Sequence, residues 1–263
     1  AQKLFPIIPV SQCFFRKKSV RRVLHYDQPC LILPFPTVSV GLSPTTPYPA
    51  LAFKRSLHNM NPLNSILGTI ISGFVLAIII VVALGATGLN LWSLTVWFHV
   101  LAGVVWIGLL YYFNFVQVPA VGNALAEADS GGPGPAAINK YVAPRALMWF
   151  RWGAVATWLT GASALESLGK SMYSIEGSGL VTAFTLQAPM TTIGIGAWLG
   201  TIMLFNVWVL IWPNQKKILG IVEASPEQIA GAKKVALMAS RTNTLLSIPM
   251  LMCMIGPGHG LPF

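Results

Sequence analysis

The sequence is poor in charged residues, and this excludes an ordinary soluble protein. Charged side chains make up 9% of the 263 residues and hydrophobic ones 54%, whereas roughly a quarter of the residues of soluble domains are charged. A soluble domain of this size would not cover its surface with so few charges. The composition therefore predicts an integral membrane protein.

Cysteine is also scarce, and its spacing indicates no specific site. Cys13, Cys30 and Cys253 lie far apart in the chain. There is no CxxC pair and no CxxCH motif. The sequence therefore predicts neither a cysteine metal site nor a covalently attached haem within these residues.

Acidic residues are especially rare in the first 59 residues, which hold eight basic residues and one acid, Asp27. Most of the net charge of +10 lies in this tail. This location indicates a membrane-surface role or a topology signal rather than a DNA-binding face. We expect the lipid bilayer as a partner and no nucleic acid.

The tail at residues 1–59 also lacks any apolar run long enough to span a membrane, and its eight prolines oppose helix formation. The first methionine is Met60. Three interpretations stay open: an untranslated upstream region, a basic targeting segment, or an extension that lies across a partner protein. We therefore divide the chain into this basic, proline-rich tail and a transmembrane domain at 60–263.

Long apolar runs dominate the rest of the chain. Each has close to the ~20 residues that a helix needs to cross a bilayer, and the breaks between them carry Gly, Pro, Asn and charged residues. The predicted fold class is all-α, a polytopic membrane helix bundle with about five transmembrane helices. The predicted spans are about 66–84, 91–118, 146–165, 190–212 and 235–255, the last of them interrupted by Pro249.

The positions of lysine and arginine predict the orientation of these spans. Basic residues are enriched in cytoplasmic connections of membrane proteins. With the N-terminus inside, the outer connections hold only Lys170. The predicted topology is therefore N-in/C-out. The basic residues of the predicted inner connections are Lys140, Arg145, Lys216, Lys217, Lys233, Lys234 and Arg241.

Two histidines, His99 and His259, occur after residue 60. His99 lies about eight residues inside the outer end of the second span, and His259 follows the fifth span in a glycine-rich segment on the same side. Two histidines on different helices and on one side of the membrane are what bis-imidazole haem ligation requires. The alternatives are a structural histidine bonded to a neighbouring helix for His99 and a solvated loop histidine for His259.

Residues spaced by three and four form one face of the second span. The polar residues on this face indicate that the face points into the bundle. There it either packs against a neighbouring helix or lines a site. Gly103, one turn below His99, would leave room for a porphyrin plane. Asn206 of the fourth span is expected to hydrogen-bond to this face. The face consists of His99, Gly103, Trp106, Leu110, Asn114 and Gln117.

Arg151 is a charged residue about one turn inside the third span, next to Trp152. One interpretation is that its side chain extends to the cytoplasmic interface. The other is that it pairs with a cofactor propionate or an anionic substrate.

Several segments resemble the membrane domain of PuuD-type urate oxidases, and the similarity extends over roughly residues 90–255. The His-x3-Gly-x2-Trp-x-Gly pattern that starts at His99 also resembles the wider HemJ and CopD group of haem-linked membrane proteins. The segments that carry the resemblance are FHVLAGVVWIGLLYYFN at 98–114, RWGA at 151–154, NVWVLIWPNQK at 206–216, RTN at 241–243 and SIPML at 247–251.

The resemblance implies a multi-pass redox protein of the bacterial inner membrane that binds haem b and hydroxylates urate. The full-length family has a C-terminal cytochrome c domain, and this sequence has no CxxCH. Electrons would then pass to a separate cytochrome or another partner protein. The expected cofactor-binding residues are His99, His259, Gly103, Trp106, Asn114 and Arg151, with the two histidines as iron ligands.

Two functions from different classes follow from these observations. The first is a haem-linked membrane oxidoreductase subunit, resembling the urate oxidase membrane domain. The second is a non-catalytic accessory subunit of a larger respiratory or photosynthetic membrane complex, which would use its tail and tryptophan-rich faces to bind partners. No acidic residue lies inside a predicted span, so the sequence identifies no acid–base carboxylate.

Overall fold

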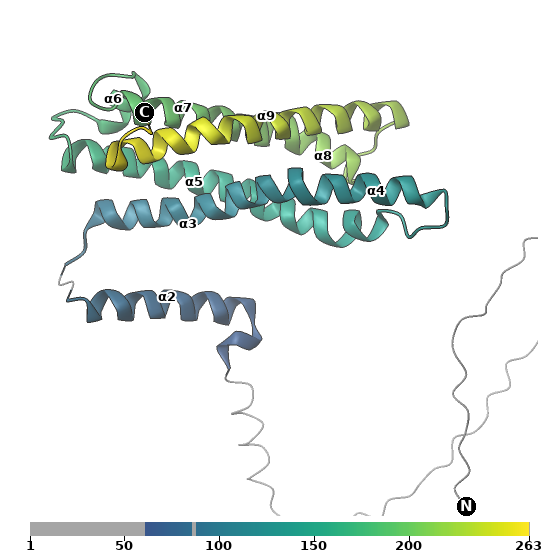
Figure 1. Ribbon diagram of the computed structural model, residues 1–263, viewed down its shortest axis with the longest axis horizontal. Coiled ribbons are helices and arrows are strands. Elements are labelled where there is room, and N and C mark those ends of the chain that lie inside the picture. Colours follow the sequence, from purple (N-terminus) through teal and green to yellow (C-terminus); the bar gives the residue numbers. More distant parts are fainter. Residues whose placement is uncertain (1–60, 86–87, 263) are drawn as a thin grey trace, which may run out of the picture. The chain divides into compact units, whose positions relative to one another are not determined.

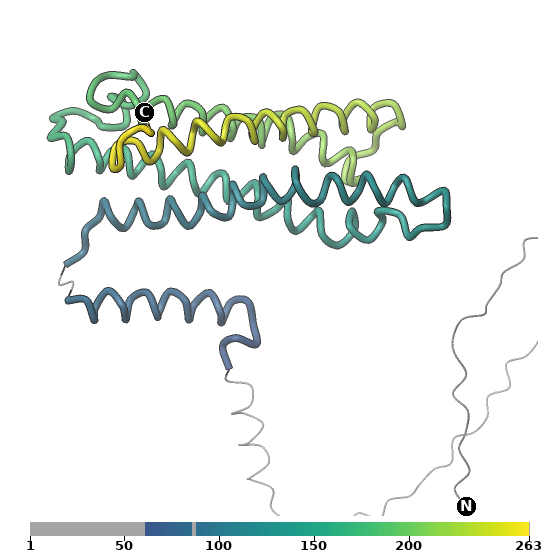
Figure 2. Tube along the Cα trace, viewed as in Figure 1, coloured from purple at the N-terminus to yellow at the C-terminus, as the bar shows by residue number. Residues whose placement is uncertain are grey.

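The computed structural model describes residues 61–85 and 88–262 (Figures 1 and 2). The tail at 1–59, with Cys13 and Cys30, lies outside these residues. The chain divides into two units, residues 1–76 and 77–263. Helix α2 crosses the boundary between them and is described by itself.

Helix α2 (Ile66–Ala83) follows a short 3-10 helix, η1 (Pro62–Asn64). The Ser65 side chain accepts a hydrogen bond from the backbone N–H of Gly68 and so caps the first turn of α2. The 18 residues of α2 carry no charge and extend over about 27 Å. The helix begins where the first span is predicted and ends one residue earlier.

The second predicted span is part of a longer continuous helical run, Leu91–Ala128. It consists of α3 (Leu91–Tyr112), the π-helix η2 (Phe113–Gln117) and α4 (Val118–Ala128). The Asn90 side chain caps its N-terminus by accepting from the backbone N–H of Ser93.

Helix α5 (Ala143–Ser171) follows the π-helix η3 (Ile138–Val142) and contains the third predicted span. Helix α7 (Thr191–Phe205) continues through the π-helix η4 (Asn206–Ile211) into α8 (Trp212–Ile218). This run contains nearly all of the fourth predicted span.

Helix α9 (Pro226–His259) is longer than the fifth predicted span and runs continuously past Pro249 and Pro257. The predicted interruption at Pro249 is therefore wrong, because α9 continues through this residue. A capping box at the N-terminus explains the early start: Ser225 accepts from the N–H of Gln228, and the Gln228 side chain accepts from the N–H of Ser225.

Each π-helix ends two residues before a proline. These prolines are Pro119, Pro144 and Pro213. Proline lacks a backbone N–H, and in an α-helix its ring clashes with the carbonyl four residues earlier. A wider π turn moves that carbonyl away and so removes the clash. The prolines therefore account for the local widening without ending the helices.

Three described helical runs are long and apolar enough to cross a membrane: Ile66–Ala83, Leu91–Ala128 and Thr191–Ile218. These runs support the predicted membrane class. Helices α5 and α9 contain the other two predicted spans but carry more charges, among them Arg151 and Lys170 in α5 and Lys233 and Arg241 in α9.

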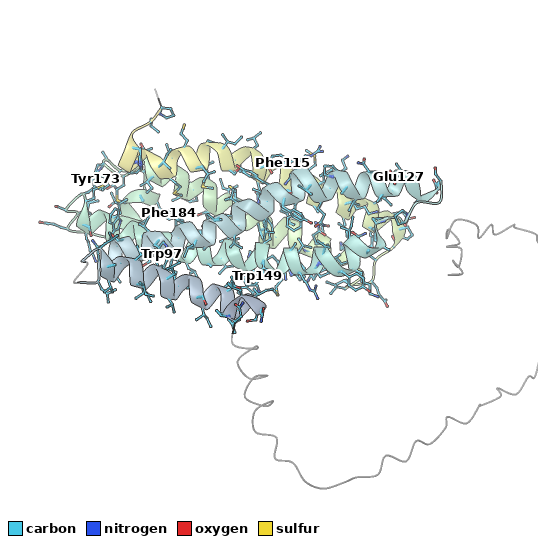
Figure 3. All side chains as sticks on the ribbon, turned by 60° about the horizontal axis from the view of Figure 1, so that its bottom comes forward. Trp97, Phe115, Glu127, Trp149, Tyr173 and Phe184 are labelled. Atoms are coloured by element: carbon cyan, nitrogen blue, oxygen red, sulfur yellow. The ribbon has the colours of Figure 1, made fainter. Side chains whose placement is uncertain are left out.

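In the second unit, α3, α5, α7 and α9 run side by side (Figure 1). A buried cluster joins all four helices, and a second lies where α5, α6 (Gly179–Phe184) and α7 meet. Phe184 of α6 packs edge-on against Trp198 of α7 (Figure 3). The first cluster includes Trp106, Leu110, Phe150, Met203, Val207 and Met250; the second includes Leu165, Leu168, Ala183, Met190 and Ala197.

Candidate functional site

His99 lies eight residues from the start of α3 and faces α5. Its Nδ1 is 2.8 Å from the backbone carbonyl oxygen of Thr157. A carbonyl oxygen only accepts hydrogen bonds, so the contact requires the imidazole proton on Nδ1. The lone pair of Nε2 is then free, and no described residue hydrogen-bonds to it.

Gly161, one turn beyond Thr157 on α5, provides the space for the imidazole. A Cβ at Gly161 would lie 2.8 Å from Cε1 and 3.0 Å from Nδ1 of His99. Gly153, one turn before Thr157, meets α3 in the same way: its Cβ would lie 3.4 Å from the backbone N of Trp106. Small residues every four positions thus bring the two helices close together.

This geometry fits a metal-bound imidazole. Histidine ligands of metals commonly donate their other ring N–H to a carboxylate or a backbone carbonyl, which fixes the tautomer and the orientation of the ring. His99 has this arrangement toward Thr157. Among the described residues, no group of three or more His, Cys, Asp or Glu side chains could hold a metal ion.

Trp106 lies about two turns beyond His99 on α3, and its side chain is only 2% exposed. Its Nε1–H is buried and has no acceptor among the described residues. An unsatisfied buried donor is costly. A carboxylate, carbonyl or water at this position would satisfy it, so Trp106 also fits a bound polar group.

The face of α3 that the spacing predicts does point into the bundle, but it contacts two different helices. Gly103 faces α5, where its Cβ would lie 3.8 Å from Cγ2 of Thr157. Asn114 lies beyond α3 in η2, and its Nδ2 donates to Ser240 Oγ of α9 at 2.8 Å. Asn114 is about 22 Å along the helix from His99, so its observed contact is one between helices.

Asn206 hydrogen-bonds to α9 rather than to the face that contains His99. Its Nδ2 donates to Oδ1 of Asn243 at 2.8 Å, and Asn243 Nδ2 donates to the carbonyl of Met203 at 3.0 Å. Both asparagine side chains are buried. The prediction of an interhelical bond is confirmed, but the predicted partner was wrong.

Arg151 stacks on an aromatic ring instead of extending freely. Its Cζ lies 3.4 Å from the ring centroid of Trp212 in α8. Its Nε is buried and has no hydrogen-bond partner among the described residues. Arg151 precedes Thr157 by six residues, or about 9 Å along α5.

His259 is the last residue of α9 and is exposed. The C-terminal end of α9 and the N-terminal end of α3 lie at the same end of the bundle (Figure 1). No side-chain hydrogen bond of the described residues involves His259. His99 and His259 therefore share an end of the molecule, and the structure records no contact between them.

Glu166 is the carboxylate at the end of the third predicted span. Its Oε2 accepts from Ser178 Oγ at 2.6 Å and from Leu180 N at 3.2 Å, and Lys170 Nζ lies 3.1 Å from Oε1. These groups, the Ser178 hydroxyl most strongly, lower the pKa of Glu166 to about 2. At neutral pH Glu166 is ionised and holds α6 to α5, so it is not a proton donor.

Part of the chain matches a known protein family. Residues 175–263, which are 89 of the 263 residues, match the model of the family described as urate oxidase N-terminal. The match confirms the predicted urate oxidase resemblance for the segments at 206–216, 241–243 and 247–251. Searches of curated proteins and of solved structures found no match.

The matched residues comprise α6 to α9 and include His259. The other predicted cofactor residues lie before them, on α3, η2 and α5. The comparisons therefore support a urate oxidase-like membrane protein and leave the haem and the HemJ and CopD resemblance as predictions.

Proposed function

We propose that this chain is a haem-linked redox protein of the bacterial inner membrane that acts on urate or a similar small molecule. The observation that carries the haem proposal is the His99 imidazole, which donates to the Thr157 carbonyl and leaves Nε2 free. The urate oxidase match at 175–263 supports the choice of substrate class.

Five membrane crossings with the N-terminus inside are part of this proposal. Helices α5 and α9 run alongside the apolar α3 and α7. The connections that carry most loop lysines and arginines lie at one end of the bundle, the right end in Figure 1, and Lys170 lies at the other. Such an asymmetry marks the basic end as cytoplasmic. The basic residues there are Lys140, Arg145, Lys216, Lys217, Lys233 and Lys234.

In this proposal His99 would hold haem b through Nε2, and His259, at the same end of the bundle, is the candidate second ligand. When bound, the haem would supply one-electron chemistry. Gly161 and Thr157 orient the imidazole. The unpaired Nε1–H of Trp106 is available to a carboxylate or carbonyl oxygen nearby.

A hydroxylation in which water provides the oxygen atom releases two electrons and two protons. The electrons would pass to an acceptor such as a cytochrome or another redox partner in the membrane. Glu166, with a pKa of about 2, would not buffer the released protons at neutral pH.

The test is a reduced-minus-oxidised spectrum of the detergent-purified protein. We expect a b-type haem signal in the wild type and its loss in His99→Ala. Thr157→Val is the matched control, because it removes the side-chain hydroxyl but keeps the carbonyl that binds Nδ1. This variant should retain the haem. Urate consumption with an artificial electron acceptor should follow the haem content.

A folded wild-type sample without haem would overturn this proposal. Stoichiometric copurification of other membrane proteins with such a haem-free sample would instead support the accessory-subunit function. A haem signal that survives in His99→Ala would exclude His99 as an essential ligand.

A further inference from the structure

Two cations share one tryptophan ring where α5 meets η4 and α8. Arg151 Cζ lies 3.4 Å from the ring centroid of Trp212, and Lys216 Nζ lies 5.8 Å from the same centroid. The nearby rings of Trp152 and Trp208 pack edge to face at 5.7 Å. We refer to these residues as the basic-aromatic cluster: Arg151, Trp152, Trp208, Trp212 and Lys216.

This cluster contains N–H donors without acceptors. Arg151 Nε and Trp208 Nε1 are both buried, and neither has a hydrogen-bond partner among the described residues. The one ion pair found in the described part of the chain joins Glu166 and Lys170, about 22 Å along α5 from Arg151. The cluster thus holds two positive charges and two unsatisfied donors, with no carboxylate to balance them.

The cluster opens to the outside of the bundle. The Trp152 side chain of the cluster is 59% exposed. Lys216 and Lys217 lie on the next turn of α8, at the end of the bundle that carries the basic connections. Tryptophan and basic residues at this level are typical of the layer in which lipid headgroups lie.

We propose that the basic-aromatic cluster binds the phosphate of an anionic phospholipid headgroup. A phosphodiester supplies oxygen acceptors for the Arg151 guanidinium and the Trp208 N–H, and its charge is balanced by Arg151 and Lys216. The exposed ring of Trp152 offers an apolar surface to the glycerol and acyl portions of the lipid. Free phosphate would leave the ring of Trp152 uncovered, whereas a lipid would cover it. The exposed ring therefore favours a lipid over free phosphate.

The experiment measures thermal unfolding of the detergent-purified full chain with added phosphatidylglycerol, phosphatidylcholine or inorganic phosphate. We expect phosphatidylglycerol to raise the Tm of the wild type by about 3–6 °C, because a ligand that binds the folded state stabilises it. Phosphatidylcholine, which has no net charge, and inorganic phosphate should give little shift.

Arg151→Gln should lose most of the phosphatidylglycerol shift. The matched control is Arg145→Gln, which removes the same charge from an exposed position near the start of the same helix and should keep the shift. Trp208→Phe provides a second variant that retains an aromatic ring but removes the unpaired N–H. It should bind the lipid several-fold more weakly, and native mass spectrometry should show fewer retained lipids.

Equal phosphatidylglycerol shifts in the wild type, Arg151→Gln and Trp208→Phe would overturn the proposal. An equal loss in Arg145→Gln would assign the effect to overall charge and not to this cluster. A shift of the same size with inorganic phosphate alone would overturn the assignment to a lipid.

Discussion

At the scale of single residues, a hydrogen bond to the backbone carbonyl of Thr157 fixes the orientation of the His99 ring against α5. An ionisable residue in an apolar helix predicts a partner, and a bond to a neighbouring helix is one of the two predicted roles of His99. The partner, the Thr157 carbonyl, depends on how α3 and α5 align, which no single-helix pattern specifies. The signal that was missed is the spacing Gly153-x3-Thr157-x3-Gly161 on α5.

Gly161 gives the residue-scale prediction. In Gly161→Ala the new methyl group would overlap the His99 ring, with 2.8 Å from Cβ to Cε1. We expect the variant to lower the free energy of unfolding by about 1–3 kcal/mol, as overpacking generally does. Denaturant titration in detergent micelles measures this change.

The control for Gly161→Ala is Gly200→Ala on α7. A Cβ at Gly200 meets no atom within 4 Å, and alanine favours a helix over glycine by roughly 0.5–1 kcal/mol. This variant should be neutral or slightly more stable. A similar loss of stability in both variants would show that the His99 ring is not what requires glycine at 161.

At the scale of the elements, helix positions were predicted well wherever charge is absent. Helix α2 matches its predicted span to within one residue at its end. The predictions for α5 and α9 were too short, because hydropathy follows the apolar core and not the charged turns that extend beyond it. The short helix α6 was not predicted, since its six residues are held by contacts with α5 and α7.

The attachment of α6 to α5 gives the element-scale prediction. Hydrogen bonds from Ser178 and Leu180, together with Lys170, lower the pKa of Glu166 from 4.5 to about 2. A lowered pKa in the folded state means that the ionised carboxylate stabilises the protein at any pH above about 4.5. This contribution is lost as the pH falls from about 4.5 toward 2.

Thermal unfolding between pH 6 and pH 3 tests this dependence. Glu166→Gln should unfold at a lower temperature than the wild type at pH 6, and the difference should shrink as the pH falls. Glu176→Gln is the control, because Glu176 is an acid on the connection between α5 and α6 and makes no side-chain hydrogen bond in the described residues. A difference that stays constant with pH would contradict the assigned role of Glu166.

At the scale of the whole molecule, the bundle separates its loop charges between two ends, and this gives a topology prediction. Ser130 lies on the connection between α4 and α5 at the basic end, and Glu176 lies on the connection between α5 and α6 at the other. In a variant without Cys13 and Cys30, a Glu176→Cys residue should react with a membrane-impermeant maleimide added to spheroplasts.

Ser130→Cys should react with the same reagent only after the membrane is permeabilised. The variant that lacks only Cys13 and Cys30 is the control for Cys253. Because Cys253 is buried, it should remain unlabelled. Labelling of Ser130→Cys in intact spheroplasts would invert the proposed orientation. Labelling of both positions would reduce the number of crossings.

The π-helix η2 limits how far one face can be followed along the helical run Leu91–Ala128. A π turn holds one residue more than an α turn, so η2 shifts the angular phase of every later residue by roughly 100° relative to α3. The part of the predicted face before η2 contacts α5 through His99 and Gly103, and Asn114, within η2, contacts α9. For this reason, a spacing of three and four residues does not place residues before and after η2 on a common face. A relative without this extra residue would present a different set of side chains to α9 while keeping the surroundings of His99.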